Sequence, residues 1–311
     1  MQNFEKVNQE IEKKFLNALP KIDINRRLNL SWSNWGFGQE KLMMSVRRLA
    51  KFGVKFIELH GNRYGEDLGY NSSEVKKILD GEGLKVAGIC GMFSRENDLS
   101  SVSGIHRQHA IDYIRRNLEL GASLGAKYML IVPGAVGRPE PYDRYEFHRS
   151  VETLRRVAHV FEETEIVGAI EPIRSAEVSF CHTFKEAKDY IEAVDHPWIS
   201  KINGDIYHML TEEDHIAETI LEYGGYLINL HMADTNRRAL GKGMMDLDTI
   251  LMALYLIGYN NGSCFCTPEP LGPGGDPYPA MHGIPDESVL DWLVEDTVQY
   301  FRAREEAILE R

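Results

Sequence analysis

Four residues of this chain that can bind a divalent metal, Glu171, Asp205, His231 and Glu269, each end a short apolar run. The runs occupy positions 166–170, 199–204, 226–230 and 263–268. Three carboxylates and one imidazole form an oxygen-rich set, which suits Mn²⁺, Mg²⁺ or Co²⁺ better than the ligand sets of structural zinc sites. Any one of these residues alone would more often be a solvated turn residue or a helix cap. The hypothesis of a metal site therefore depends on their order along the chain.

The intervals between the four residues are 34, 26 and 38 positions. Each interval fits about one strand plus one helix, as expected when consecutive parallel strands supply one ligand apiece. The elements that would position the ligands recur along the whole chain. Eight apolar, strand-like runs are expected, at 28–32, 54–59, 85–90, 128–132, 166–170, 199–203, 226–230 and 263–267. Helical patterns separate and follow them, at 40–52, 73–80, 106–124, 144–162, 184–193, 212–223, 247–256 and 287–308.

Eight strand-then-helix units with near-continuous apolar strands predict an α/β fold, a single (β/α)₈ TIM barrel. A doubly wound sheet is the main alternative, but no G-x-G-x-x-G follows the first strand. We expect residues 1–27 to be an N-terminal helical extension, with a helix over 4–19, and residues 28–311 to form the barrel and catalytic domain. In a barrel, the carboxyl ends of the strands meet at one mouth, so the four ligands would share one site.

Three further polar residues follow the proposed ligands closely: Glu177, His208 and Arg237. Glu177 could bind substrate hydroxyls or support a metal ligand, or it could cap a helix. His208 stands three residues after Asp205, so one could bind metal and the other substrate, although a buried, hydrogen-bonded core histidine is the plain alternative. Arg237 could hold a substrate oxygen, or lie in solvent.

The net charge of −12 argues against nucleic acid or an anionic membrane as the main partner. The four cysteines have no C-x-x-C spacing and are expected to be reduced. The first residues resemble no secretory signal, and no run is long enough to span a membrane, so we expect a cytoplasmic protein. One metal with carboxylates that also reach the substrate favours proton abstraction next to a carbonyl group. Metal-activated hydrolysis of a phosphodiester would generally use more histidines, more metals and basic residues.

These residues resemble the sugar phosphate isomerase/epimerase-like barrels of the xylose-isomerase type, and among them the ketose 3-epimerases of the tagatose/psicose type. The resemblance covers about residue 28 to the end and is most specific at 171–177, 205–209, 231–237 and 269–270. It implies one divalent metal, with Mn²⁺ favoured over Mg²⁺ and Co²⁺, bound by Glu171, Asp205, His231 and Glu269. It also implies that Glu171 and Glu269 are the acid/base pair and that Glu177, His208 and Arg237 contact substrate.

The N-terminal extension, the segment from His60 to Gly65, and the Gly/Pro-rich loop after Glu269 differ from ordinary ketose epimerases. Size and motifs together resemble the large subunit of C-glycoside deglycosidases, which share the barrel and pair with a small β-subunit. This resemblance implies a carbon–carbon lyase: a 3-oxo-C-glycoside loses a proton next to its keto group and expels an aromatic aglycone. His148 would then be a candidate base, with His60 and His282 as alternatives that contact substrate.

Several alternatives remain open at this point. The first is a ketose 3-epimerase or keto-sugar isomerase with the same metal-enolate chemistry. A barrel that binds sugar without catalysis and a metal-dependent endonuclease are the others. The sequence leaves undecided whether the chain forms a hetero-oligomer or a homo-oligomer.

Overall fold

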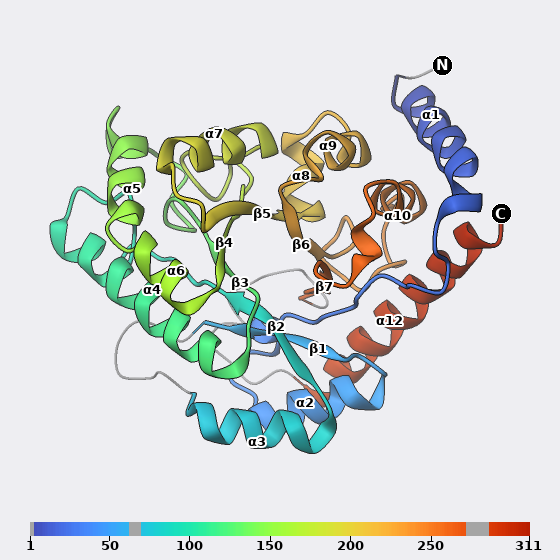
Figure 1. Cartoon of the computed structure of the whole chain (residues 1–311), viewed down its shortest axis with the longest axis horizontal. Helices are drawn as coiled ribbons and strands as arrows, with labels where there is room; N and C mark the ends of the chain where they lie inside the picture. The colour runs from blue at the N-terminus through green and yellow to red at the C-terminus, as the bar shows by residue number, and fades with distance from the viewer. Residues whose placement is uncertain (1–2, 62–69, 272–285) are drawn as a thin grey trace.

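Seven parallel strands form one sheet in the order of the chain, in a computed structural model that describes residues 3–61, 70–271 and 286–311 (Figure 1). They are β1 (Phe56–His60), β2 (Lys85–Cys90), β3 (Tyr128–Ile131), β4 (Val167–Ile170), β5 (Ile199–Asp205), β6 (Leu227–Met232) and β7 (Phe265–Pro268). All neighbouring pairs are parallel, as the near-continuous apolar runs predict. Seven of the eight predicted strands are therefore present.

The remaining predicted strand, residues 28–32, closes the sheet into a barrel without forming a regular strand. This segment and the residue after it make isolated parallel bridges, Leu30 to Cys266 of β7 and Ser33 to Glu58 of β1. The backbone N–H of Ser31 donates to the Cys266 carbonyl at 2.8 Å, and that of Glu58 donates to the Trp32 carbonyl at 2.9 Å. Because this segment bonds to both edge strands, it completes the barrel predicted from the sequence.

Helices surround the strands. They are α1 (Asn3–Ala18), α2 (Leu42–Lys51), α3 (Ser72–Glu82), α4 (Gly104–Leu124), α5 (Glu146–Arg155), α6 (Ala158–Thr164), α7 (Phe184–Val194), α8 (Ile206–Glu212), α9 (Ile216–Tyr223), α10 (Leu247–Leu256) and α12 (Glu287–Leu309). Three 3₁₀ turns, η1 (Leu19–Lys21), η2 (Asn34–Phe37) and η3 (Tyr259–Asn261), complete the described elements. Within the described ranges, no helix is long and apolar enough to cross a membrane.

Two predicted helices differ from those in the structure. The helix expected over 144–162 is divided into α5 and α6. The helix expected over 212–223 begins only at Ile216, because Glu213 is extended and the side chain of His215 caps α9 by accepting from the Glu218 N–H. A separate helix, α8, directly follows β5, and Asp205 caps it. This short helix brings His208 to the end of the barrel that holds the proposed ligands.

Helix α1 packs on the outside of the barrel against α10, and α1 and the C-terminal end of α12 lie on the same side of the molecule (Figure 1). Ile11 and Phe15 are buried in this contact, and Asn8 Nδ2 donates to Asp246 Oδ2 at 2.8 Å. The predicted helical extension therefore shares its hydrophobic core with the barrel. The domain boundary at residue 28 stays a prediction.

Candidate metal centre and substrate cavity

The four proposed metal ligands lie together at the carboxyl ends of four consecutive strands. Glu171 directly follows β4, Asp205 ends β5, His231 lies near the end of β6, and Glu269 directly follows β7. His231 Nδ1 is 3.3 Å from Glu171 Oε1 and 3.3 Å from Glu269 Oε2. Ligand atoms of Asp205, His231 and Glu269 lie within 4.8 Å of one another. The barrel brings together residues that are far apart in the sequence, as their order predicts.

The register between neighbouring strands fixes the level along the barrel axis at which these side chains lie. Asp205 is paired directly with His231 across β5 and β6. The backbone N–H of Glu171 donates to the Ile131 carbonyl of β3, and that of Glu269 donates to the Met232 carbonyl of β6, both at 2.9 Å. Each ligand backbone is therefore held by a neighbouring strand.

The residues fit a hard divalent cation. Asp205 Oδ1 accepts the N–H of Tyr207 at 2.7 Å as the cap of α8, whereas Asp205 Oδ2 is buried and accepts no hydrogen bond among the described residues. His208 Nε2 lies 3.3 Å from Oδ2. A buried carboxylate oxygen without a hydrogen-bond donor is costly, and a divalent cation would satisfy it.

Burial and mutual repulsion perturb the carboxyl groups. Burial raises the pKa of Glu269 to about 8; repulsion by Asp205 and Glu171 adds to this effect, and His231 opposes it. Burial also raises the pKa of Glu171, against the attraction of His231. For Asp205, burial acts in the same direction, but the nearby cationic groups, His208 first, outweigh it and lower the pKa.

Both ring nitrogens of His231 face carboxylates: Nε2 faces Glu58, and Nδ1 faces Glu171 and Glu269. Burial alone would lower the pKa of His231, but Glu269 and Glu58 raise it well above its usual value. In this arrangement the ring holds a proton that a metal ion would have to displace from Nδ1. The site therefore concentrates negative charge around one cationic ring.

A cavity of about 470 Å³ opens above these residues. Its lining includes the predicted substrate contacts Glu177, His208, Arg237 and His60. Its wall is partly apolar, formed by Trp35, Met92, Phe93, Val132, Val136 and Ile173. The mouth of the barrel is thus a pocket of the size that holds small ligands, about 300–1,000 Å³.

Arg237 and Glu177 are both held by neighbouring side chains. The guanidinium of Arg237 lies 4.5 Å from the centre of the Tyr207 ring, and its Nη2 is 4.0 Å from Glu269 Oε1. Glu177 Oε1 accepts from Arg174 Nε at 2.6 Å, and Arg174 Nη1 donates to the Tyr207 hydroxyl at 2.9 Å. Tyr207 therefore lies between two arginines that line the cavity.

One predicted histidine, His148, is not brought to the site. His148 is an exposed residue of α5 and does not line the cavity, because the helix turns it toward solvent. His148 is therefore not placed to act as a base in this cavity. His282 lies outside the described residues, as does most of the loop after Glu269.

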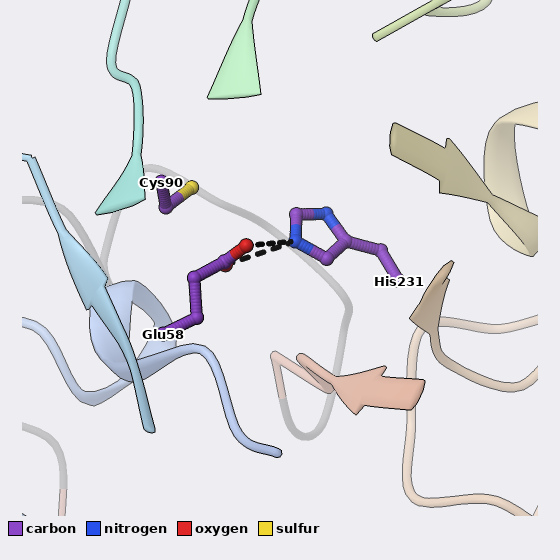
Figure 2. Close-up of side chains that lie close together, drawn as sticks. All are labelled: Glu58, Cys90 and His231. Carbon is purple, nitrogen blue, oxygen red and sulfur yellow. Dashed lines mark hydrogen bonds and ion pairs between the residues drawn. The ribbon is translucent and has the colours of Figure 1, made fainter. Parts of the chain in front are cut away.

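Two residues of the site, Glu58 and Trp35, were not predicted. Glu58 of β1 is fully buried, and its Oε2 accepts from His231 Nε2 at 2.9 Å (Figure 2). The indole N–H of Trp35, in η2, donates to Glu269 Oε2. A carboxylate inside the strand-like run 54–59 was the available signal for Glu58. The sequence carried no comparable signal for Trp35.

The four cysteines are free, as expected, and Cys90, Cys181 and Cys266 are buried. Cys90 lines the cavity beside Glu58 and His231 (Figure 2). Burial raises the pKa of the Cys90 thiol well above its usual value, and the neighbouring carboxylates add to the effect. The thiol therefore keeps its proton at neutral pH.

Residues 46–284 match the family model described as the xylose isomerase-like TIM barrel, so this chain belongs to that family. The broad resemblance seen in the sequence is confirmed. Two of its relatives are sugar epimerases. A D-psicose 3-epimerase of Ruminiclostridium cellulolyticum is 30% identical over 69% of this chain and 74% of its own length. A 3-dehydro-D-guloside 4-epimerase of Escherichia coli is 27% identical over 75% of this chain and 89% of its own length.

Solved structures share the fold. A D-allulose 3-epimerase from Methylomonas sp., in complex with D-allulose, superposes with a TM-score of 0.78 at 20% identity, covering 90% of this chain and 98% of its own. A 3-keto-D-glucoside 4-epimerase from E. coli gives a TM-score of 0.70 at 23% identity, covering 86% of this chain and 99% of its own. The narrower resemblance to C-glycoside deglycosidases stays a prediction.

Proposed function

We propose that this protein is a divalent-metal-dependent sugar epimerase that inverts a carbon next to the keto group of a keto sugar. The observation that carries the proposal is the pair of buried carboxylates, Glu171 and Glu269, that flank His231 Nδ1 at 3.3 Å each. Epimerisation next to a carbonyl needs one group to remove a proton and another to return it on the opposite face. Two carboxylates from strands on either side of β5 and β6 can meet this requirement.

The named reactions of the relatives support the same chemistry. A psicose 3-epimerase acts at the carbon beside the C2 keto group, and a 3-dehydro-guloside 4-epimerase acts at the carbon beside a C3 keto group. The two reactions differ in substrate but share proton exchange next to a carbonyl. We therefore favour epimerisation over the lyase reaction as the main function of this chain.

Glu171, Asp205, His231 and Glu269 would hold the metal, with Mn²⁺ favoured and Mg²⁺ or Co²⁺ as alternatives. When bound, such an ion would stabilise the negative charge that develops on the carbonyl oxygen after proton removal. Glu171 and Glu269 would exchange the proton. The Trp35 N–H holds the Glu269 carboxylate in place, which supports a defined direction of proton transfer.

The remaining polar residues of the cavity would orient the sugar. His208 and Arg237 are buried beside the ligand set, and Glu177 lies farther along the cavity wall, paired with Arg174. Their donors and acceptors suit the hydroxyl groups of a sugar. His60, at the end of β1, lines the same cavity and is a further candidate contact.

The second candidate is elimination of an aglycone from a 3-oxo-C-glycoside. The apolar part of the cavity wall favours it, because Met92, Phe93, Val136 and Ile173 offer surface that a free hexose does not need. Both reactions begin with the same proton removal, so the same residues would serve. A small β-subunit, a higher oligomer and a cytoplasmic location remain predictions.

The test is to follow solvent deuterium uptake by NMR with Mn²⁺-supplemented protein. Candidate substrates are psicose, fructose, tagatose, a 3-keto-glucoside and a 3-oxo-C-glucoside. We expect exchange at the carbon next to the keto group together with inversion at that carbon. Aglycone release from the last substrate, with little inversion, would favour the lyase instead. Absence of exchange with every keto sugar would refute both candidates.

A further inference from the structure

A layer of polar side chains lies inside the barrel directly beneath the proposed ligands. Successive side chains of a strand point to opposite faces, so residues two positions apart share a face. Accordingly, the residues two positions before three of the ligands also point inward, and these are Asn203, Asn229 and Thr267. Asn203 Nδ2 donates to Glu171 Oε1 at 3.2 Å, and Asn229 Nδ2 donates to Asn203 Oδ1 at 2.7 Å. Thr267 Oγ1 donates to Asn229 Oδ1 at 2.6 Å.

Glu58 completes this layer from the other side of the barrel. Its Oε1 accepts from the Tyr128 hydroxyl at 2.8 Å and from Asn229 Nδ2 at 3.1 Å. The Tyr128 ring fits there because the neighbouring strand has Gly88, where a Cβ would lie 2.4 Å from the ring. Glu58 is fully buried and does not line the cavity, so it cannot touch a substrate. Its contact with the proposed site is through His231 Nε2, 2.9 Å from Oε2 (Figure 2).

We propose that Glu58 is a positioning residue that prepares His231 to bind the metal through Nδ1. A neutral imidazole has one N–H donor and one lone pair, and the partner of one nitrogen determines the state of the other. By accepting from Nε2, Glu58 keeps a proton on that nitrogen, so Nδ1, which faces Glu171 and Glu269, is the nitrogen that would give up its proton to a metal ion. A carboxylate on the outer nitrogen also makes the imidazole a stronger metal ligand. This inference rests on the proposed metal site.

A different reading of the same residues places an ion on the opposite side of the ring. Ligand atoms of Glu58, Cys90 and His231 lie within 4.8 Å of one another, so they could themselves surround an ion. That ion would need His231 Nε2, which already donates to Glu58. The two arrangements predict different effects of Cys90 on metal affinity: only an ion on the Nε2 side would need the thiol.

The experiment measures Mn²⁺ affinity of the full chain by isothermal titration calorimetry for wild type, Glu58→Gln, Tyr128→Phe and Cys90→Ser. We expect Glu58→Gln to weaken binding about 10- to 100-fold, as loss of such hydrogen-bonding partners of metal ligands does elsewhere. Tyr128→Phe is the matched control, because it removes one bond to Glu58 but keeps the carboxylate and its bond to His231. Tyr128→Phe should lose less Mn²⁺ affinity than Glu58→Gln. Cys90→Ser should bind as wild type.

Unchanged affinity in Glu58→Gln would overturn the proposal and leave Glu58 a structural residue. A loss in Cys90→Ser as large as in Glu58→Gln would also overturn it, because the ion would then lie on the Nε2 side. A crystal structure of wild-type protein soaked in Mn²⁺ gives the answer even if Glu58→Gln does not fold. The ion must lie at Nδ1 with Glu58 still bonded to Nε2; an ion at Nε2, or no ion, contradicts the proposal. Because these readouts do not use activity, they remain informative if the proposed epimerase reaction is wrong.

Discussion

Arg237 Nη2 lies 4.0 Å from Glu269 Oε1, with the guanidinium stacked over Tyr207. Arg237 has a positive φ of 57°, a conformation uncommon outside glycine, so the backbone turn itself directs this side chain into the site. The side chain is buried, and its Nε has no hydrogen-bond partner among the described residues. These features suit a guanidinium that completes its bonds with a substrate oxygen.

Arg237→Lys should therefore reduce kcat/KM about 10- to 100-fold, the range for loss of a hydrogen bond to a charged group. Lysine keeps the charge but loses the planar fork and the stacking on Tyr207. The matched control is Arg238→Lys, since Arg238 is the next residue and is exposed. Equal rates for the two variants, measured on the best keto sugar, would exclude Arg237 from substrate binding.

Glu171→Gln and Glu269→Gln should each lower the rate of solvent deuterium exchange about 10²- to 10⁴-fold, the usual contribution of a positioned acid or base. Glutamine keeps the shape of the side chain but cannot carry the proton. Glu163→Gln, an exposed residue of α6, is the control and should exchange at the wild-type rate. Circular dichroism checks that the folds are equal. Normal exchange in both site variants would point to other residues as the acid and base.

Metal binding should release protons at neutral pH. Burial raises the pKa of Glu269 to about 8, and the neighbouring carboxylates hold the pKa of His231 well above its usual value, so these two groups hold protons at neutral pH that a cation must displace. Apparent affinity should therefore rise with pH, most strongly below the Glu269 value of about 8. Calorimetry at one pH in two buffers of different ionisation enthalpy counts the protons. Identical heats in both buffers would contradict the prediction.

Glu146→Gln should destabilise the fold by about 3 kcal/mol, because it breaks a buried ion pair with Arg138. Glu146 also accepts from Ser179 Oγ at 2.5 Å and from the Tyr142 N–H at 2.9 Å, so it joins the loops that follow β3 and β4. Urea unfolding measures the change. Glu152→Gln, on an exposed position of the same helix, should cost less than about 1 kcal/mol.

The same pair gives a pH dependence. Burial raises the pKa of Glu146, but the bonds from Arg138 and its neighbours outweigh burial and lower it. A depressed folded-state pKa stabilises the protein above the unfolded-state value, and this stability is lost as pH falls through the folded-state value. The difference in free energy of unfolding between wild type and Glu146→Gln should therefore be largest at pH 7 and become smaller in acid. A difference that stays the same in acid would exclude this linkage.

The sequence by itself determined the alternation of strands and helices and the end of the barrel at which the proposed ligands lie. Apolar runs of strand length alternate with helical patterns, and parallel strands in a closed sheet all end at one rim, so Glu171, Asp205, His231 and Glu269 had to approach one another. Local pattern was enough, because each ligand's position depends mainly on the end of its own strand. Where a side chain caps a short helix, as His215 does for α9, the local pattern gave the wrong helix boundary.

Only the tertiary structure decided which other residues join the site. Glu58 contacts His231 across the barrel, although the two residues are 173 positions apart in the sequence. Trp35 contacts Glu269 where the N-terminal segment and the last strand close the barrel. His148 lies on a helix whose orientation depends on packing, and its face is turned to solvent. Strand order fixes which ends lie together, but barrel closure and the rotation of each helix fix which side chains touch. These depend on contacts between distant segments, which no local pattern contains.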